Sequence, residues 1–399
     1  MLVQDRIAVD QALAFRLDGH YLARRSPPGS MLRAAGACGI QNTPPGSAAL
    51  SLHARVEGLT PGDVERALDI DKTLMQTFSL RGAAYVSPTA DAAVFTRGVL
   101  PGDEDSMRFF IRGAGPAFDK AGMSAAEAVR LTSDAVLEVL DGRALPKSEL
   151  AVELADRVAE RLSPGQLEAW RSPGGYAPRQ PLGEAIVRFC LYVNALEGSF
   201  CFVTRRNAAH FVRTDQWLGA PLSEADPQEA RAGLARRYIS CYGPSTPEHF
   251  SEWVGISLAG ASNAWEPMAK ELVEVDFEGR KAWIREPDLP RLMSPREPEG
   301  TRFLPPHDPY LQMRDRATLI PDKGLRRLIW RAVGNPGIVL YKGRPVAMWR
   351  PQKKGKTLGI SIEQFAPLAQ AERSDIEAEA TTLPPFKGCT KADVGFKSL

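Results

Sequence analysis

Gln41 and Thr43 are the two side chains whose types and spacing most directly suggest chemistry. They lie in a short polar segment, residues 39–47 (GIQNTPPGS), in which Pro44 and Pro45 restrict the backbone. Side chains two residues apart on an extended backbone project to one face, so an amide and a hydroxyl would stand together there. Such a pair can hold a water molecule or one edge of a ligand. The same residues also suit a loop that leads into a helix, so the segment by itself leaves both interpretations open.

Basic side chains gather at two expected hairpins and offer contacts to phosphate groups. In proteins that place a helix in a DNA groove, a nearby hairpin often contacts the DNA backbone with its tip. Basic residues at such tips would therefore form a surface that binds duplex DNA. A single pair of basic residues is more often an ordinary solvent-exposed part of the surface than a binding site. Arg236 and Arg237 lie in an expected amphipathic helix, where ion pairing is the better interpretation. The predicted phosphate contacts are Arg205, Arg206, Lys342, Arg344, Arg350, Lys353, Lys354 and Lys356.

Metal, nucleotide and cofactor sites are not indicated by the sequence. The five cysteines are odd in number and widely spaced with no CxxC pair, which argues against a disulfide framework and against a zinc site. The five histidines have no spacing that suits a set of zinc ligands. The sequence also lacks GxGxxG after a strand, GxxxxGK[ST], GxSxG and HExxH motifs. We therefore expect reduced, mostly buried thiols, no bound metal and no cofactor.

Length, charge and hydropathy place the chain among ordinary globular proteins. Its 399 residues are 44% apolar, enough for about two to four cores of usual size. The 50 Lys and Arg against 48 Asp and Glu give a formal charge of +2, so nucleic acid could be bound only through a local patch. No run approaches the ~18 apolar residues of a membrane span, and the N-terminus becomes acidic before a core of signal-peptide length. We expect a soluble protein of the cytoplasm.

Helices followed by a short hairpin recur three times along the chain. The predicted strand pairs lie within 74–86, at 199–204 with 209–213, and at 272–277 with 281–285. Helix starts are marked by residues that cap free backbone amides, namely Thr60, Ser124 and Ser163. This order is typical of winged helix-turn-helix units. We predict a mainly α fold with small β-hairpins and three tandem units, at residues 1–103, 104–222 and 223–286.

The C-terminal part, residues 287–382, is expected to be richer in β-structure. The predicted elements are a basic hairpin with strands at 339–341 and 346–349, a strand at 358–362 and a helix at 367–380. The tail at 383–399 contains Gly and Lys and shows little apolar periodicity. We therefore expect the tail to be loosely ordered or to lie over the surface.

Several sequence blocks, in a fixed order, resemble a known family. Residues 237–255 (RYISCYGPSTPEHFSEWVG) are similar to the YGP-(S/A)TP-x-x-F-x-x-W-x-G signature of the winged-helix DNA glycosylases of the AlkZ and YcaQ type. Residues 303–310 (FLPPHDPY), 314–316 (RDR) and 341–350 (YKGRPVAMWR) resemble later blocks of that family. The resemblance covers most of residues 7–350. It implies three tandem winged-helix units in a C-shaped molecule whose partner is double-stranded DNA, alkylated or cross-linked.

The resemblance also gives the opening segment a role. The family's catalytic motif is Gln, one spacer residue, then Gln or Asp, in a G-(L/I)-Q-x-(Q/D) context; Gln41 matches the first position and Thr43 replaces the second. The resemblance implies a monofunctional glycosylase that hydrolyses the N-glycosidic bond of N-alkylated, cationic purines or of bulky or cross-link adducts. Because such a leaving group is already positive, an amide that places the attacking water supplies much of what the reaction needs.

Two other functions stay open at this point. Thr43 departs from the family motif, and the segment RGAAY at 81–85 stands where many relatives have R-G-T-L-H. Both departures suit a winged-helix DNA-binding protein without catalysis, whose binding would fall steeply with salt. The near-neutral net charge also allows an interaction protein that does not touch DNA. Release of 7-alkylguanine from treated DNA separates the enzyme from both alternatives.

Overall fold

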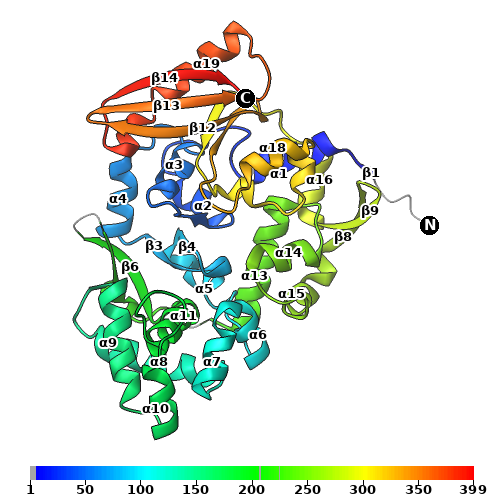
Figure 1. Ribbon diagram of the computed structural model, residues 1–399. Helices are drawn as coiled ribbons and strands as arrows, with labels where there is room; N and C mark the ends of the chain where they lie inside the picture. Colours follow the sequence, from blue (N-terminus) through cyan, green and yellow to red (C-terminus); the bar gives the residue numbers. More distant parts are fainter. Residues whose placement is uncertain (1–5, 206–207, 224) are drawn as a thin grey trace.

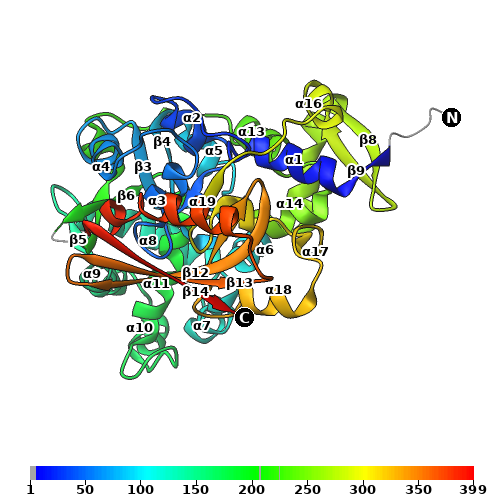
Figure 2. The ribbon, with the colours of Figure 1, turned by 90° about the horizontal axis from the view of Figure 1, so that it is seen from above.

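Helices and four small sheets make up the protein, of which the computed structural model describes residues 6–205, 208–223 and 225–399 (Figures 1 and 2). In this part of the chain the strands form one five-stranded sheet and three three-stranded sheets. Figure 1 shows the five-stranded sheet and the helices of residues 104–196 at opposite ends, with a small sheet of the N-terminal region between them. No helix among the described residues has the length and apolar character that a membrane crossing needs. The predicted helix-rich fold with small β-hairpins is confirmed.

The N-terminal region holds residues 39–47 between helices and one of the small sheets. Its elements are β1 (Arg6–Ile7), α1 (Val9–Gly19), α2 (Met31–Gly36), β2 (Ile40–Gln41), α3 (Ser47–His53), α4 (Pro61–Asp69), β3 (Leu74–Phe78), β4 (Ala84–Pro88) and α5 (Ala92–Phe95). The sheet has the order β2-β4-β3, and both pairs are antiparallel. The predicted start of α4 is confirmed, because Thr60 Oγ accepts from the Asp63 amide and Asp63 accepts in return from the Thr60 amide.

The second region is a helical layer that ends in the expected hairpin. Its elements are α6 (Glu104–Phe110), α7 (Gly115–Ala121), α8 (Ala125–Val139), β5 (Leu145–Pro146), α9 (Lys147–Ala159), α10 (Pro164–Arg171), α11 (Leu182–Leu196), β6 (Phe200–Arg205), β7 (Ala208–Arg213) and α12 (Thr214–Leu218). Ser124 and Ser163 cap α8 and α10 as predicted. Apolar side chains of α8 and α11 face each other in a second core, so this region carries its own hydrophobic centre.

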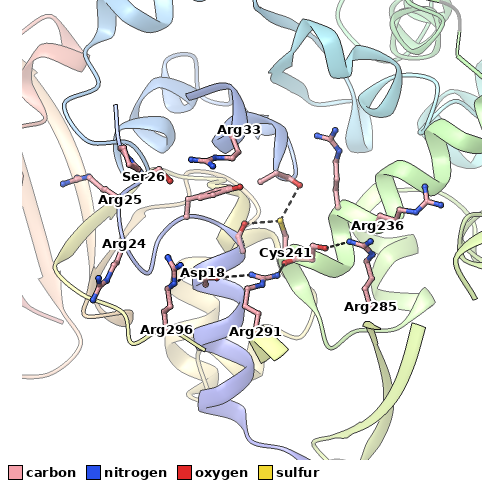
Figure 3. A pocket seen from close by; sticks show the side chains of 16 residues that line it. Asp18, Arg24, Arg25, Ser26, Arg33, Arg236, Cys241, Arg285, Arg291 and Arg296 are labelled. Carbon is pink, nitrogen blue, oxygen red and sulfur yellow. Dashed lines mark hydrogen bonds and ion pairs between the residues drawn. The ribbon is translucent and has the colours of Figure 1, made fainter. Parts of the chain in front are cut away.

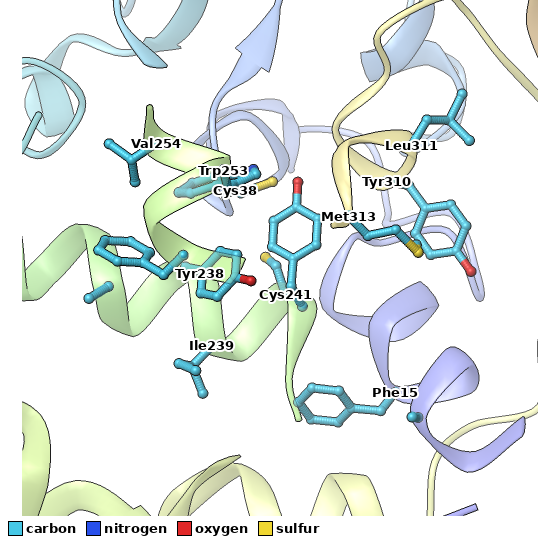
Figure 4. Packing of buried hydrophobic residues seen from close by; sticks show 14 of the residues in the cluster. Phe15, Cys38, Tyr238, Ile239, Cys241, Trp253, Val254, Tyr310, Leu311 and Met313 are labelled. Carbon is cyan, nitrogen blue, oxygen red and sulfur yellow. The ribbon is translucent and has the colours of Figure 1, made fainter. Parts of the chain in front are cut away.

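The third region packs with the N-terminal helix as well as with itself. Its elements are α13 (Pro227–Tyr242), α14 (Pro247–Val254), α15 (Leu258–Trp265), β8 (Leu272–Phe277), β9 (Arg280–Arg285) and α16 (Leu289–Met293). The first strand of the chain, β1, pairs in parallel with β8, and α1 packs against α13. The largest core therefore joins the start of the chain to residues 232–292, and Figure 4 shows Phe15, Tyr238 and Trp253 within it.

The C-terminal region forms the five-stranded sheet, in the order β10-β11-β12-β13-β14. Its elements are β10 (Thr301–Leu304), α17 (Arg316–Leu319), α18 (Lys323–Ile329), β11 (Gly337–Tyr341), β12 (Arg344–Lys354), β13 (Thr357–Gln364), α19 (Gln370–Ala380) and β14 (Lys391–Ser398). The predicted hairpin, the next strand and the helix are confirmed.

The expectation of a loosely ordered tail is wrong, because the tail forms β14. This strand pairs in parallel with β13 from Lys391 to Ser398. Its alternate residues Ala392, Val394 and Phe396 pack against the core of the sheet, while the residues between them are more exposed. Two-residue alternation over a short stretch is enough for a strand when a paired neighbour supplies the hydrogen bonds.

Candidate active site

Gln41 lies on the short strand β2 at the edge of the N-terminal sheet. In the antiparallel pairing of β2 with β4, Gln41 stands opposite Tyr85. The Gln41 side chain is 6% exposed, and its amide makes no hydrogen bond to any residue that the structure describes. Directly opposed residues of an antiparallel pair have neighbouring side chains. The amide is therefore held beside a tyrosine, with its donor and acceptor atoms unused by the described protein groups.

Asn42, the spacer residue, fixes the loop that follows Gln41. Its amide nitrogen donates to Gln76 Oε1 at 2.9 Å, and its side-chain oxygen accepts from the amides of Gly46 at 2.8 Å and Ala48 at 3.1 Å. The Asn42 backbone amide donates to the Ala84 carbonyl at 2.8 Å. These contacts close the loop onto the first turn of α3, so the spacer has a positioning role.

Thr43 is exposed at the surface of this loop, before a cis peptide bond to Pro44. The strand ends at Gln41, so the alternation expected for an extended backbone does not reach Thr43. The predicted site residues are thus close in sequence but differ in exposure: the Gln41 side chain is buried and the Thr43 side chain is open to solvent.

Arg81 ties Tyr85 to the segment after Asp308. It lies in a 3-10 turn, Leu80–Gly82, with a left-handed φ of 55°. One terminal nitrogen donates to Tyr85 Oη and to Gln312 Oε1, each at 3.1 Å, and the other donates to the Trp253 carbonyl. Burial raises the pKa of the Tyr85 hydroxyl, against the opposing charge of Arg81. Tyr85 is therefore a neutral hydroxyl that accepts a charged hydrogen bond.

Arg314 adds a cation near Tyr85, and Arg316 adds one near Arg81; the sequence interpretation did not include either among the site residues. The Nε and Nη2 atoms of Arg314 are buried and have no hydrogen-bond partner among the described residues. Burial, together with the charges of Arg81 and Arg316, lowers the pKa of Arg314 to about 10. Burial also lowers the pKa of Arg316, again with a contribution from Arg81. The charges of the neighbouring arginines thus oppose the charged form of Arg314, whereas the carboxylate of Glu252 favours the charged form of Arg316.

Lys387 is another cation near the active-site loop. It ends the 3-10 turn Pro384–Lys387, and its Nζ lies 3.9 Å from the point where a side chain would begin on Gly46. Burial lowers the pKa of this amine. Lys353 Nζ lies 3.3 Å from the corresponding point on Gly388. The tip of the β12–β13 hairpin and the turn before β14 thus lie close to the loop that follows Gln41.

The predicted phosphate contacts do not form one cluster. Lys342 and Arg344 stand at one end of β12, whereas Lys353, Lys354 and Lys356 stand at the other, and a strand of this length spans roughly 35 Å. The Lys342 end packs beside α1: a side chain added at Gly343 would lie 2.7 Å from Leu17 Cδ1. Of these two groups, only the one at the β12–β13 tip lies near the loop.

The other predicted contacts are spread over the surface. Arg344 pairs with Glu372 at 3.4 Å, and Arg350 donates to the Gly334 carbonyl at 3.1 Å. Arg205 is exposed at the end of β6, whereas Arg206 lies outside the described residues. The interpretation of Arg236 and Arg237 as ion-paired is confirmed. Arg236 contacts Glu229 and Glu271, and Arg237 contacts Asp91.

Comparisons with known proteins agree with the resemblance. A profile of the family described as "DNA glycosylase AlkZ-like" matches residues 34–386. The interstrand DNA cross-link repair glycosylase of Streptomyces sahachiroi is 26% identical over 350 residues, which cover 85% of this chain and 86% of that protein. The solved structure of the Streptomyces sahachiroi DNA glycosylase AlkZ superimposes with a TM-score of 0.75 at 22% identity, over 98% of this chain and 100% of the other, and supports the shared fold. The chain belongs to the AlkZ-like family of DNA glycosylases.

Proposed function

We propose that this protein excises N-alkylated, cationic purines, including bulky or cross-link adducts, from double-stranded DNA by attack of water on the N-glycosidic bond. Three tandem winged-helix units in a C-shaped arrangement would hold the duplex. The recurrence of helices before each of the three small sheets supports this arrangement. The similarity to an enzyme named for repair of interstrand DNA cross-links supports the adduct class.

The proposal rests on one observation: the side-chain amide of Gln41 makes no hydrogen bond to any described residue. Its oxygen can accept a hydrogen bond from the attacking water, because no described protein group occupies it. A purine alkylated at N7 leaves without prior protonation, so the enzyme's main tasks are to place that water and to stabilise a positively charged sugar. A neutral amide acceptor suits both tasks, since it stays an acceptor at every pH at which DNA is double-stranded.

Thr43 supplies the second acceptor in this proposal. Its hydroxyl is shorter than the Gln or Asp side chain of relatives, but it lies on a loop that Asn42 holds in place. Exposure lets it meet a nucleotide that has left the stack, as base-excising enzymes require. The shorter reach predicts slower water activation than a Gln would give, and the chemistry is unchanged.

Two groups of cations would bind the DNA backbone beside the reacting nucleotide. Arg314, with buried guanidinium nitrogens that lack partners, suits a phosphate close to Tyr85. Lys353, Lys354 and Lys356 at the β12–β13 tip suit phosphates on the other side of the loop, next to Lys387. Contacts of this kind position the duplex and carry no sequence information.

Release of 7-methylguanine from a methylated duplex tests the proposal. The wild-type chain is expected to release the base and leave an abasic site, and Gln41→Ala is expected to lose this activity while still binding the duplex. Gln228→Ala is the matched control, because Gln228 is an exposed glutamine at the start of α13. Binding by the wild-type chain without release from methylated or cross-linked DNA would favour the non-catalytic DNA-binding protein instead.

A further inference from the structure

Three potential metal ligands from distant parts of the sequence meet in the core beneath the active-site strand. His20 follows α1, Cys38 precedes β2 and Cys241 lies in the last turn of α13. One ligand atom from each lies within 4.8 Å of the other two. Their exposed fractions are 1%, 2% and 2%. All five cysteines are free and buried, but this is the set that brings two thiols and an imidazole together among the described residues.

One pair of donors has the spacing of a tetrahedral zinc site, and the third donor lies within 4.8 Å of both. Zinc binds thiolate sulfur at about 2.3 Å and imidazole nitrogen at about 2.0 to 2.1 Å, which places bound sulfur and nitrogen roughly 3.5 Å apart. Cys38 Sγ and His20 Nδ1 are 3.6 Å apart. Two sulfur donors and one nitrogen donor favour zinc over the oxygen-seeking ions magnesium and calcium.

The surrounding groups hold the donors in place. Gly19 allows α1 to approach α13 closely, because a side chain there would lie 2.4 Å from the Ser240 carbonyl oxygen. The Cys241 thiol contacts the carbonyl oxygens of Gly19 and Ala37, each 3.5 Å from Sγ, and metal binding would replace these thiol contacts. The His20 ring packs edge-on against Tyr242 and Tyr310 at centroid distances of 4.7 and 5.5 Å.

His20 has a free hydrogen-bonding position that matches this arrangement. Its Nε2 atom is buried without a hydrogen-bond partner among the described residues, and the contact to Cys38 is made by Nδ1. An imidazole that binds a metal through Nδ1 carries its proton on Nε2. The ring is therefore placed with Nδ1 toward Cys38. Figure 4 shows Cys38 and Cys241 in the surrounding core.

A solvent cavity reaches one of the donors. Its volume is about 620 Å³, and Gly19, Ala37 and Cys241 form part of its wall (Figure 3). Half of the lining residues are arginines, among them Arg33 and Arg291, and the acidic residue Asp18 lies with them. An ion can approach Cys241 from this side, and a water molecule from the cavity can complete a fourth coordination position. Two thiolates cancel the charge of the dication, so the bound site adds no net charge to this cationic wall.

We propose that His20, Cys38 and Cys241 bind one Zn²⁺ ion, which fixes the backbone immediately before Gln41. Binding converts both cysteines to thiolates and releases their protons to solvent. The ion has a structural role: it ties the end of α1, the start of β2 and the end of α13 to one centre.

Zinc binding by the reduced, full-length chain is the test. After chelator treatment and dialysis, the chain is titrated with Zn²⁺ against a chromophoric chelator, and bound metal is counted by mass spectrometry. We expect one zinc per chain for the wild type and for Cys389→Ser, a matched buried cysteine in the C-terminal sheet region. Cys38→Ser and Cys241→Ser should each lower the affinity by more than about tenfold, the lower range for losing even an outer partner of a metal site.

Cobalt keeps the test independent of how the variants fold. Co²⁺ added to the reduced wild-type chain should give the near-ultraviolet charge-transfer band of thiolate-bound cobalt, and Zn²⁺ should remove that band. The proposal is overturned if the reduced wild type binds no zinc and shows no such band, or if both serine variants bind zinc as the wild type does. Metal content is read without DNA, so neither result depends on glycosylase activity.

Discussion

Gln41 and Tyr85 stand directly opposite each other in the antiparallel pair of β2 and β4. The Gln41 amide, which makes no hydrogen bond to any described residue, therefore lies beside the buried Tyr85 side chain. Tyr85 is in turn held by Arg81, whose guanidinium also reaches Gln312 and the carbonyl of Trp253. A chain of contacts thus connects the active-site strand to the third region and to the segment after Asp308. The geometry around Gln41 depends on residues more than 200 positions away in sequence.

Removal of the Tyr85 hydroxyl should destabilise the protein. Tyr85→Phe leaves a charged donor of Arg81 without one of its acceptors, and such a loss costs about 1 to 3 kcal/mol. Tyr310→Phe is the matched control, because the Tyr310 hydroxyl is buried without a hydrogen-bond partner and its loss should be neutral or stabilising. Urea unfolding followed by fluorescence compares the two variants. Equal effects of the two substitutions would show that the Arg81 contact does not support the fold.

Restoration of the longer acceptor next to Gln41 should speed excision. Thr43→Gln places a second amide in the exposed loop, and we expect single-turnover release of 7-methylguanine to rise by up to about tenfold, or about 1.4 kcal/mol of barrier. Thr43→Ala should slow the reaction, since it removes the hydroxyl and adds nothing. A Thr43→Ala variant as fast as the wild type would exclude Thr43 from the reaction.

We expect the buried charge of Arg314 to increase the affinity for DNA and to decrease the stability of the fold. Arg314→Met removes a guanidinium that has unpartnered buried nitrogens, so thermal stability should be unchanged or higher while affinity for duplex DNA falls. The slope of log affinity against log salt should decrease in magnitude by about one. Arg171→Met, at an exposed arginine that ends α10, is the control and should change neither quantity. A less stable Arg314→Met variant with normal binding would assign Arg314 to the fold.

Arg55 and Asp308 should form the strongest single link between the N-terminal region and the C-terminal half. Two hydrogen bonds of 2.8 Å join them, and the two side chains are 1% and 0% exposed. Asp308→Ala leaves a buried arginine unpaired and should cost about 3 to 5 kcal/mol of stability. The double variant Arg55→Met with Asp308→Leu should recover much of this loss, because it removes both charges. Chemical denaturation of Arg55→Met, Asp308→Leu and the double variant checks the coupling, and additive effects of the two single substitutions would contradict it.

Local patterns in the sequence were sufficient to predict most helices and hairpins of the fold. Capping residues such as Thr60 and Ser124 act within one helical turn, so their effects can be predicted from neighbours. The turn at Asp308 is a local feature as well, since its carboxylate accepts from the Tyr310 amide two residues on. The same carboxylate also pairs with Arg55, which is 253 residues away, and no local pattern indicates that contact.

The features that the sequence did not predict depend on contacts between residues far apart in the chain. β14 was missed because its hydrogen bonds come from β13 and its apolar alternation is short. Family motifs pointed to Gln41 but not to the cations near its strand partner Tyr85 and near the loop that follows it. These cations are Arg81, Arg314 and Lys387, which share no recognisable spacing. The cysteine count argued against a zinc site, yet His20, Cys38 and Cys241 converge through three separate elements. Spacing rules recognise ligands that share one local segment, and these ligands do not.

The most direct test of the account is single-turnover excision of 7-methylguanine by wild-type and Gln41→Ala proteins at saturating enzyme. The same preparations are assayed for duplex binding, and Gln228→Ala serves as the control. The account predicts that Gln41→Ala lowers the excision rate by at least about 100-fold, the usual loss for one preorganised polar group, with affinity for the duplex unchanged. Wild-type excision that persists at full rate in Gln41→Ala would contradict it.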